Sequence, residues 1–237
     1  MNGRLYGIGV GPGDPELLTI KAKKILEDVD FIFTPQARKK GRSLALSIID
    51  EVVDYTGKVE KLYFPMTYQQ KKLEEARDKA TDRIIKYLKE DKKMAFITLG
   101  DPMLYSTYQY IYQRLKKKGV EKKVKTIPGI TSINASTSRL NLPLVKEEEK
   151  VAIVSDISDL KEFENIINQF ETTVVMKLSR NLPTALRVLR KLKLIDNSVL
   201  VSRCGQENEE IIYNLDSVDS DEIDYLSLLI IKQERIS

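Results

Sequence analysis

The stretch Arg4-Leu-Tyr-Gly-Ile-Gly-Val-Gly-Pro-Gly-Asp-Pro-Glu-Leu-Leu-Thr19 decides the fold of this chain. A short apolar run leads into a turn that contains Gly9, Gly11 and Gly13, and Asp14-Pro15 follows it. Glycine allows positive φ and lets another molecule approach the backbone closely. Aspartate suits a helix N-cap, and proline suits the first helical position after it. The stretch therefore predicts a strand, a glycine turn and then a helix.

The spacing of these glycines does not match the dinucleotide-binding fingerprint G-x-G-x-x-G. If the fingerprint starts at Gly9, Asp14 takes the place of its last glycine; if it starts at Gly7, Pro12 does. The second predicted strand runs into Thr34-Pro35, so no acidic residue stands where a dehydrogenase binds ribose. These differences argue against a nicotinamide-dependent oxidoreductase.

The composition of the 237 residues excludes several kinds of enzyme. The chain has no histidine, which removes Ser-His-Asp hydrolases, His/Cys zinc sites and histidine phosphotransferases. Its one cysteine, Cys204, excludes an intrachain disulfide and fits a reducing compartment. The net charge of +4 does not by itself indicate nucleic-acid binding. With no long apolar run or signal peptide, we expect a cytoplasmic, soluble protein with no membrane, nucleic-acid or metal partner of its own.

Positive charge is concentrated in two places. One basic cluster is Arg38-Lys-Lys-Gly-Arg42 and the other is Lys116–Lys118 with Lys122-Lys123. Both are compatible with solvated surface charge. The first cluster follows a predicted strand, and open α/β sheets bind ligands at such positions. Ligand binding and solvated surface charge are therefore equally good explanations for it.

Alternating strands and helices fill the first half of the chain. Segments of these lengths predict a parallel sheet covered by helices. The expected strands are 5–10, 31–33, 59–63, 94–99 and 123–127, and the expected helices are 15–27, 43–53, 69–89, 108–117 and 131–140. We assign residues 1–140 to an N-terminal α/β domain.

The segment Asn141-Leu-Pro-Leu144, followed by the charged run Lys146–Lys150, indicates a linker at 141–148 to a C-terminal α/β domain at 149–237. Two strands near the end, 210–215 and 225–232, have no helix between them, which predicts a mixed sheet with an antiparallel edge. The other expected elements are strands 151–154, 173–176 and 198–201 and helices 160–168 and 184–192. Two such domains would form a cleft, a favoured ligand position.

Three further motifs follow predicted strands. They are Thr98-Leu-Gly-Asp-Pro-Met-Leu-Tyr-Ser106, Ile127-Pro-Gly-Ile-Thr-Ser-Ile-Asn-Ala135 and Ser202-Arg-Cys-Gly-Gln-Glu207. Each alone can be explained as a turn or a helix cap. With these motifs in this order after Gly9-Val-Gly-Pro-Gly-Asp14, the chain resembles the tetrapyrrole methylase family. Members of that family are S-adenosylmethionine-dependent enzymes of cobalamin (vitamin B12) and siroheme synthesis. The resemblance covers nearly the whole chain.

The resemblance implies the family's fold, two α/β domains with the methyl donor in the cleft between them, and a homodimer. Matched motif by motif, it implies the donor-binding residues Pro12, Leu99, Gly100, Asp101, Leu104, Thr131, Ser132, Met176 and Gly205. Such glycines permit close ligand approach, the carboxylate of Asp101 can accept hydrogen bonds from the donor, and Met176 offers polarisable packing. Core filling remains an equal explanation for Met176.

Within the family, the chain is most similar to the branch that methylates C20 of precorrin-2 or cobalt-precorrin-2, through its opening motif, Gly41-Arg-Ser-Leu-Ala45 and Thr98–Thr107. The carboxylates of this tetrapyrrole substrate call for cationic partners. The candidates are Arg38, Arg42 and Arg203, with Tyr105 as a polar contact and the one candidate catalytic residue. Another corrin-ring methylase and a non-catalytic tetrapyrrole- or nucleotide-binding regulator remain alternatives. Whether the substrate carries cobalt stays open at this point.

Overall fold

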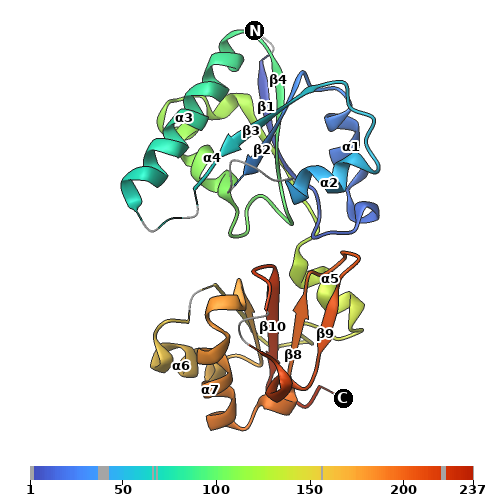
Figure 1. Ribbon diagram of the computed structural model, residues 1–237, viewed down its shortest axis with the longest axis vertical. Coiled ribbons are helices and arrows are strands. Elements are labelled where there is room, and N and C mark those ends of the chain that lie inside the picture. The colour runs from blue at the N-terminus through green and yellow to red at the C-terminus, as the bar shows by residue number, and fades with distance from the viewer. Residues whose placement is uncertain are drawn as a thin grey trace. The chain divides into compact units, whose positions relative to one another are not determined.

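In the computed structural model the chain forms two compact units, and the boundary between them lies between Thr131 and Ser132. The structure describes residues 3–36, 43–65, 67, 69–155, 157–219 and 223–236. Each unit is built on a five-stranded sheet with helices packed against it (Figure 1). The α/β fold class expected from the alternating pattern is confirmed.

The first unit contains a fully parallel sheet in the strand order β3-β2-β4-β1-β5. Its strands are β1 (Arg4–Gly9), β2 (Phe31–Gln36), β3 (Lys58–Tyr63), β4 (Lys93–Thr98) and β5 (Val124–Ile127). Its α-helices are α1 (Ile20–Leu26), α2 (Leu44–Asp50), α3 (Gln70–Lys89) and α4 (Thr107–Lys117), and a 3₁₀ turn, η2, covers Glu121–Lys123.

Helices cover both faces of this first sheet (Figure 1). Ile32 and its neighbours on one face pack against α1 and α2, while Phe33 on the other face packs against α3 and α4. Successive strand side chains point to opposite faces, so a sheet buried on both sides needs continuous apolar strands. The segment Met94–Ile97 of β4 is buried throughout, as this requires.

The helix expected over residues 15–27 is interrupted. A 3₁₀ turn, η1, covers Pro15–Leu17, and α1 begins only at Ile20. The side chain of Asp14 accepts from the N–H of Glu16 at 2.8 Å, as expected of a cap. The Thr19 hydroxyl accepts from the N–H of Ala22 at 3.2 Å, so a second cap starts the α-helix proper.

The second unit contains a mixed sheet in the order β6-β7-β10-β8-β9, in which only β6 and β7 pair in parallel. Its strands are β6 (Val151–Val154), β7 (Thr172–Met176), β8 (Ser198–Ser202), β9 (Glu210–Ile212) and β10 (Ser227–Lys232). Its helices are α5 (Ser132–Arg139), α6 (Leu160–Gln169) and α7 (Leu182–Leu192), with 3₁₀ turns η3 (Leu178–Arg180), η4 (Ile195–Asn197) and η5 (Leu215–Ser217).

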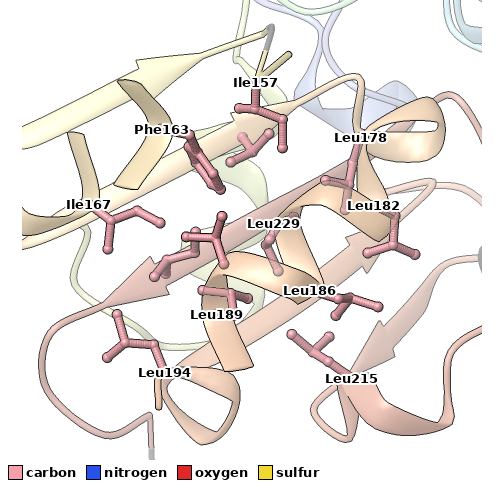
Figure 2. Close-up of a cluster of buried hydrophobic side chains, with 14 of the residues drawn as sticks. Ile157, Phe163, Ile167, Leu178, Leu182, Leu186, Leu189, Leu194, Leu215 and Leu229 are labelled. Carbon is pink, nitrogen blue, oxygen red and sulfur yellow. The ribbon is translucent and has the colours of Figure 1, made fainter. Parts of the chain in front are cut away.

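An apolar core joins α6 and α7 to one face of this sheet. Phe163 and Ile167 from α6 meet Leu182, Leu186 and Leu189 from α7 over the strands (Figure 2). Both helices show apolar residues at three- and four-residue spacing, which explains why each buries one side.

The expected antiparallel edge is correct for β9 and wrong for β10. Strand β10 lies inside the sheet, between β7 and β8, and all six residues from Ser227 to Lys232 are buried. A strand with neighbours on both sides and both faces covered reads as a continuous apolar run. The sequence Ser-Leu-Leu-Ile-Ile-Lys fits that interior position better than an edge.

The structure divides the chain before α5, whereas the sequence-based division follows residue 140. Contacts within the second unit explain the difference. Arg139, the last residue of α5, pairs with Glu209, and the buried Lys232 Nζ donates to the carbonyls of Pro143 and Leu144 at 3.2 and 3.4 Å. Helix α5 and the segment after it therefore belong with the second sheet.

None of the helices in the described parts of the chain has the length and apolar character needed to cross a bilayer. Over the same residues, His, Cys, Asp and Glu side chains form no group of three that could hold a metal ion.

Candidate functional site

Three glycines pack against one another where neighbouring strands end. Gly9 ends β1, Gly100 lies two residues beyond β4, and Gly129 lies two residues beyond β5. A Cβ placed on Gly9 would lie 2.8 Å from the N and Cα of Gly129 and closer still to the Gly100 carbonyl oxygen. Real Cβ atoms essentially never show such contacts. Glycine at these positions lets three loops meet at the carboxyl edge of the sheet.

The opening glycine loop is also bonded to the loop after β4. The N–H of Gly100 donates to the carbonyl oxygen of Gly11 at 2.8 Å, and the N–H of Val10 donates to the carbonyl of Thr98 at 3.0 Å. Gly11 and Gly100 have φ of +86° and +61°, a region that favours glycine. The opening loop therefore packs on its own sheet, and Pro12, a predicted donor-binding residue, is buried there.

Gly100 differs from its two glycine neighbours because an added Cβ would be in ordinary van der Waals contact and not crowded. An added Cβ would meet only the Thr131 Cα at 3.8 Å and the Ile130 carbonyl oxygen at 3.9 Å. Its positive φ, rather than crowding, calls for glycine at this position. The geometry leaves the backbone on this side of the loop open to another molecule.

Both carboxylate oxygens of Asp101 are engaged with backbone. Oδ1 accepts from the N–H of Met103 at 2.7 Å, and Oδ2 accepts from the N–H of Gly129 at 3.1 Å. The first bond caps the turn after β4, and the second ties this turn to the loop after β5. A carboxylate oxygen has more than one acceptor position, so these bonds leave capacity for a further donor.

Large apolar side chains are exposed in the same loops. Met103 and Tyr105 in the loop after β4 and Ile130 in the loop after β5 are 53%, 39% and 37% exposed. Leu99 and Leu104 are half-buried. Apolar side chains gathered around open backbone are typical of ligand sites.

The loop after β4 is rigidly anchored at its far end. The Ser106 hydroxyl caps α4 by accepting from the N–H of Tyr108 at 3.1 Å, and it lies 2.9 Å from the hydroxyl of Thr98. Tyr105, just before this cap, has a φ of +47°. Residues held at unfavourable φ are concentrated at functional sites, where the surrounding structure fixes them.

Tyr108 explains a fourth glycine of the opening stretch. A Cβ on Gly7 would overlap the Tyr108 ring, which is fully buried, and the ring hydroxyl lies 3.0 Å from that of Thr126. Burial raises the pKa of Tyr108 to about 12, so its hydroxyl stays protonated. Gly7 therefore has a packing role.

Thr34 has a packing role as well. It is fully buried in β2, and its hydroxyl lies 2.5 Å from the hydroxyl of Ser43, which precedes α2. This bond joins the end of β2 to the Gly41–Ala45 motif through its described residue Ser43. The predicted substrate residues Arg38 and Arg42 lie outside the described residues.

In the second unit, two strand ends carry predicted site residues. Met176 ends β7 and is half-buried, and Lys177 after it has a φ of +56°. Beyond β8, Gly205 has a φ of +77°, and its N–H donates to Glu209 Oε2 at 2.7 Å. Both strand ends therefore have defined, unusual backbone conformations.

Arg203 is held by an ion pair. Its Nη2 lies 2.9 Å from Asp224 Oδ2, and Asp224 Oδ1 accepts from the N–H of Leu226 at 2.7 Å. Burial raises the pKa of Asp224, but the Leu226 N–H and the Arg203 guanidinium outweigh it and lower the pKa overall. The Arg203 side chain remains 38% exposed, so its guanidinium keeps donors available to solvent or a ligand.

Cys204, the one cysteine, is buried in the segment after β8, next to Arg203. Burial raises its thiol pKa. A protonated, enclosed thiol is a poor nucleophile.

Comparison with known proteins identifies the family. Residues 4–219 match the model of the tetrapyrrole (corrin/porphyrin) methylases. This chain belongs to that family. The match spans both units and includes every motif discussed above.

Two full-length relatives of this tetrapyrrole methylase have closely related names. A protein of Methanocaldococcus jannaschii named "Probable cobalt-precorrin-2 C(20)-methyltransferase" is 42% identical over 97% of this chain and 96% of its own length. The cobalt-precorrin-2 C(20)-methyltransferase of Salmonella typhimurium is 29% identical over 99% of this chain and 98% of its own.

Solved structures confirm the fold. A cobalamin biosynthetic enzyme, cobalt precorrin-4 methyltransferase, superposes with a TM-score of 0.75 at 18% identity, covering 97% of this chain and 94% of the other. The uroporphyrin-III C-methyl transferase of Thermus thermophilus, complexed with S-adenyl homocysteine, gives 0.70 at 24% identity, covering 98% of each chain.

The structure places the predicted residues of this tetrapyrrole methylase in separate groups. Pro12, Leu99, Gly100, Asp101, Leu104 and Thr131 lie in the adjoining strand-end loops of the first unit, and Ser132, Met176, Arg203 and Gly205 lie in the second. The structure places three further residues, Gly129, Met103 and Ile130, in these same loops, and sequence reasoning did not single them out. All three lie within the quoted motifs, and their role depends on which loops adjoin.

Proposed function

We propose that this tetrapyrrole methylase transfers a methyl group from S-adenosylmethionine to C20 of precorrin-2 or cobalt-precorrin-2 during corrin-ring synthesis. The observation that carries the proposal is the 42% identity, over 97% of the chain, to the Methanocaldococcus jannaschii relative of that name. The strand-end loops around Gly100 are consistent with it, since they combine open backbone with exposed apolar side chains.

The residues present fit a bulky methyl donor. Gly100 and Gly205 adopt positive φ, and no atom lies closer than 3.8 Å to an added Cβ at Gly100, so a ligand can approach the backbone there. We assign backbone contacts to Leu99, Gly100 and Gly205, polar contacts to Asp101, Thr131 and Ser132, and apolar packing to Leu104 and Met176. Because Pro12 is buried, its contribution would be to shape the opening loop.

The donor supplies an already activated methyl group on a positively charged sulfur. Transfer to an electron-rich ring carbon therefore needs no strong base in the displacement step. The protein must hold the two reacting carbon atoms at about 3–3.5 Å and in line, which is a matter of positioning. The hydrogen bonds of Asp101 and Ser106 serve this purpose by fixing the loop after β4.

The substrate is a macrocycle with carboxylate arms. We propose that the exposed side chains of Met103, Tyr105 and Ile130 contact its apolar faces. Arginine can pair with carboxylate in a bidentate manner, which fixes orientation, so we propose that Arg38, Arg42 and Arg203 receive the arms. Tyr105 is the candidate for handling the proton that C20 later loses.

Incubation with methyl-labelled donor and each precursor tests the activity. We expect label at C20 of precorrin-2 or cobalt-precorrin-2, located by NMR. Label at another carbon would instead indicate the activity of another corrin-ring methylase. A cobalt-precorrin-4 C(11)-methyltransferase of Methanocaldococcus jannaschii is 30% identical, but over only 65% of this chain, which makes that the weaker alternative.

Binding separates an enzyme from a regulator. A methyltransferase should bind S-adenosylhomocysteine in calorimetry, and a module that lacks the donor site should not. A comparison of rates on metal-free and cobalt-loaded precursor then decides which form is the substrate. We further propose a cytoplasmic homodimer that acts without nucleic acid, and light scattering of the purified protein tests its subunit number.

A further inference from the structure

A nearly buried carboxylate joins two segments of the second unit. Glu209 lies four residues after Gly205, and its side chain is only 12% exposed. Oε2 accepts from the N–H of Gly205 at 2.7 Å, and Oε1 accepts from Arg139 Nε at 2.8 Å. Each carboxylate oxygen thus contacts a different segment of the chain.

The charges at this position favour the ionised form. Burial raises the pKa of Glu209, but the Gly205 N–H and the Arg139 guanidinium together lower it below its ordinary value. Hydrogen bonds to an ionised acceptor are shorter and stronger than neutral ones. The carboxylate therefore anchors the Gly205 N–H strongly, and the solvent-exposed Arg139 more weakly.

The first segment is the turn after β8. The N–H of Gln206 donates to the Arg203 carbonyl, and the N–H of Glu209 donates to the Gln206 carbonyl, both at 3.0 Å. These bonds wind the chain so that the Glu209 side chain reaches back to Gly205, whose φ is +77°. The backbone N–H that Glu209 binds belongs to the glycine assigned to the donor.

The second segment is helix α5. Arg139 is its last residue and Ser132, assigned to the donor, is its first. Eight helical residues span about 12 Å as one rigid rod, so fixing one end restricts the other. Glu209 is therefore bonded to two of the segments of the second unit that carry residues assigned to the donor, the Gly205 turn and helix α5.

We propose that Glu209 is a positioning residue of the methyl-donor site, which holds the Gly205 turn and helix α5 in the arrangement that binds S-adenosylmethionine. The proposal rests on the proposed function. Glu209 does not itself touch the donor; it acts through Gly205 and, by way of Arg139, through Ser132.

Calorimetry with S-adenosylhomocysteine tests it. We expect Glu209→Ala to weaken binding by roughly tenfold or more, since charge-assisted hydrogen bonds are lost. Glu209→Gln keeps one acceptor oxygen and should lose less. Arg139→Ala removes a side chain that is 67% exposed, so it should fold normally and weaken binding a few-fold. Glu210→Gln removes a neighbouring exposed carboxylate and should bind as wild type.

Kinetics distinguish positioning from stability. We expect Glu209→Ala to raise KM for the donor while kcat largely recovers at saturation, and to speed hydrogen exchange of the Gly205 amide. Wild-type affinity in the folded Glu209→Ala protein would overturn the proposal. Should that variant not fold, wild-type affinity in both Glu209→Gln and Arg139→Ala would overturn it. Failure of the wild type to bind S-adenosylhomocysteine would instead overturn the proposed function on which it rests.

Discussion

The carboxylate of Asp101 accepts a hydrogen bond from the N–H of Gly129 at 3.1 Å, across 28 positions of the chain. One residue thereby joins the loop after β4 to the loop after β5. The sequence motif around Asp101 suggests a ligand contact, a helix cap, or both. The structure shows that Asp101 also orders the neighbouring loop, so its substitution should affect stability and ligand binding together.

Asp101→Ala is therefore expected to lower the melting temperature and to weaken S-adenosylhomocysteine binding. The loss of a charge-assisted hydrogen bond costs about 1.5–3 kcal/mol, which corresponds to roughly ten- to a hundredfold in affinity if it is a donor contact. Thermal melts and calorimetry on the purified variant measure both. Reduced stability with unchanged affinity would show that Asp101 serves only the loops.

Gly129→Ala should be strongly destabilising. Its Cβ would lie 2.8 Å from Gly9 Cα and closer to the Gly100 carbonyl oxygen, and all of these are backbone atoms that cannot rotate away. Overpacking of this kind lowers the free energy of unfolding by about 1–3 kcal/mol or more. Denaturant unfolding measures the loss.

Gly119→Ala is the matched control for that substitution. Gly119 has a positive φ of +71°, but nothing lies within 4 Å of an added Cβ. Only the backbone strain of about 1 kcal/mol should appear. Equal losses in the two variants would contradict the close packing of the three strand ends.

Gly100→Ala separates ligand approach from stability. Gly100 and Gly119 have similar positive φ, +61° and +71°, and an added Cβ is crowded at neither, so the two alanine variants should lose similar stability. If a ligand contacts the backbone at Gly100, only that variant should lose S-adenosylhomocysteine affinity, by roughly tenfold or more, because the methyl group occupies its space. Calorimetry at a temperature where both variants are folded makes the comparison. If both variants kept the same S-adenosylhomocysteine affinity, Gly100 would not be part of the donor site.

The sequence predicted most elements to within a few residues, because each depends on local pattern. The apolar run of β4 and helix α4, which begins one residue before the expected range 108–117, are examples. The mutual packing of Gly9 and Gly129 was not predictable in this way, since it depends on which strands adjoin. That β10 lies inside its sheet is likewise decided by pairing with β7 and β8 and not by its own sequence alone.

For the candidate site, too, local sequence predicts some features and only the folded chain shows the others. Gly100 and Gly205 were assigned from motifs, and their positive φ is the conformation for which glycine is suited. The partners of those motifs were missed. Asp224, which pairs with Arg203, lies 21 positions further along the chain, outside any motif, and Glu209 lies just beyond the quoted one. Such partners follow from the folded chain, in which side chains far apart in sequence come together.

Arg203→Ala is expected to raise KM for the tetrapyrrole with little change in S-adenosylhomocysteine affinity. The guanidinium is partly exposed and keeps donors beyond its bond to Asp224, so it can bind a substrate carboxylate. Arg203→Lys should recover only part of the effect, because an ammonium lacks the planar pair of donors. Steady-state kinetics with each substrate varied in turn measure this. An unchanged tetrapyrrole KM would leave Arg203 with the role of fixing the segment around Asp224.

Asp224 should make stability depend on pH in acid. The pKa of its carboxyl is lowered in the folded protein, because the Leu226 N–H and the Arg203 guanidinium outweigh the effect of burial. A group whose pKa falls on folding contributes stability that is fully present above its unfolded pKa, about 3.9 for aspartate. That contribution is lost as the pH falls through the lower, folded pKa. Asp224→Asn should therefore be less stable than wild type at pH 7, and the difference should shrink below about pH 4. Urea unfolding of both proteins across this range measures it, and a difference that stayed constant down to pH 2 would contradict the assigned pKa shift.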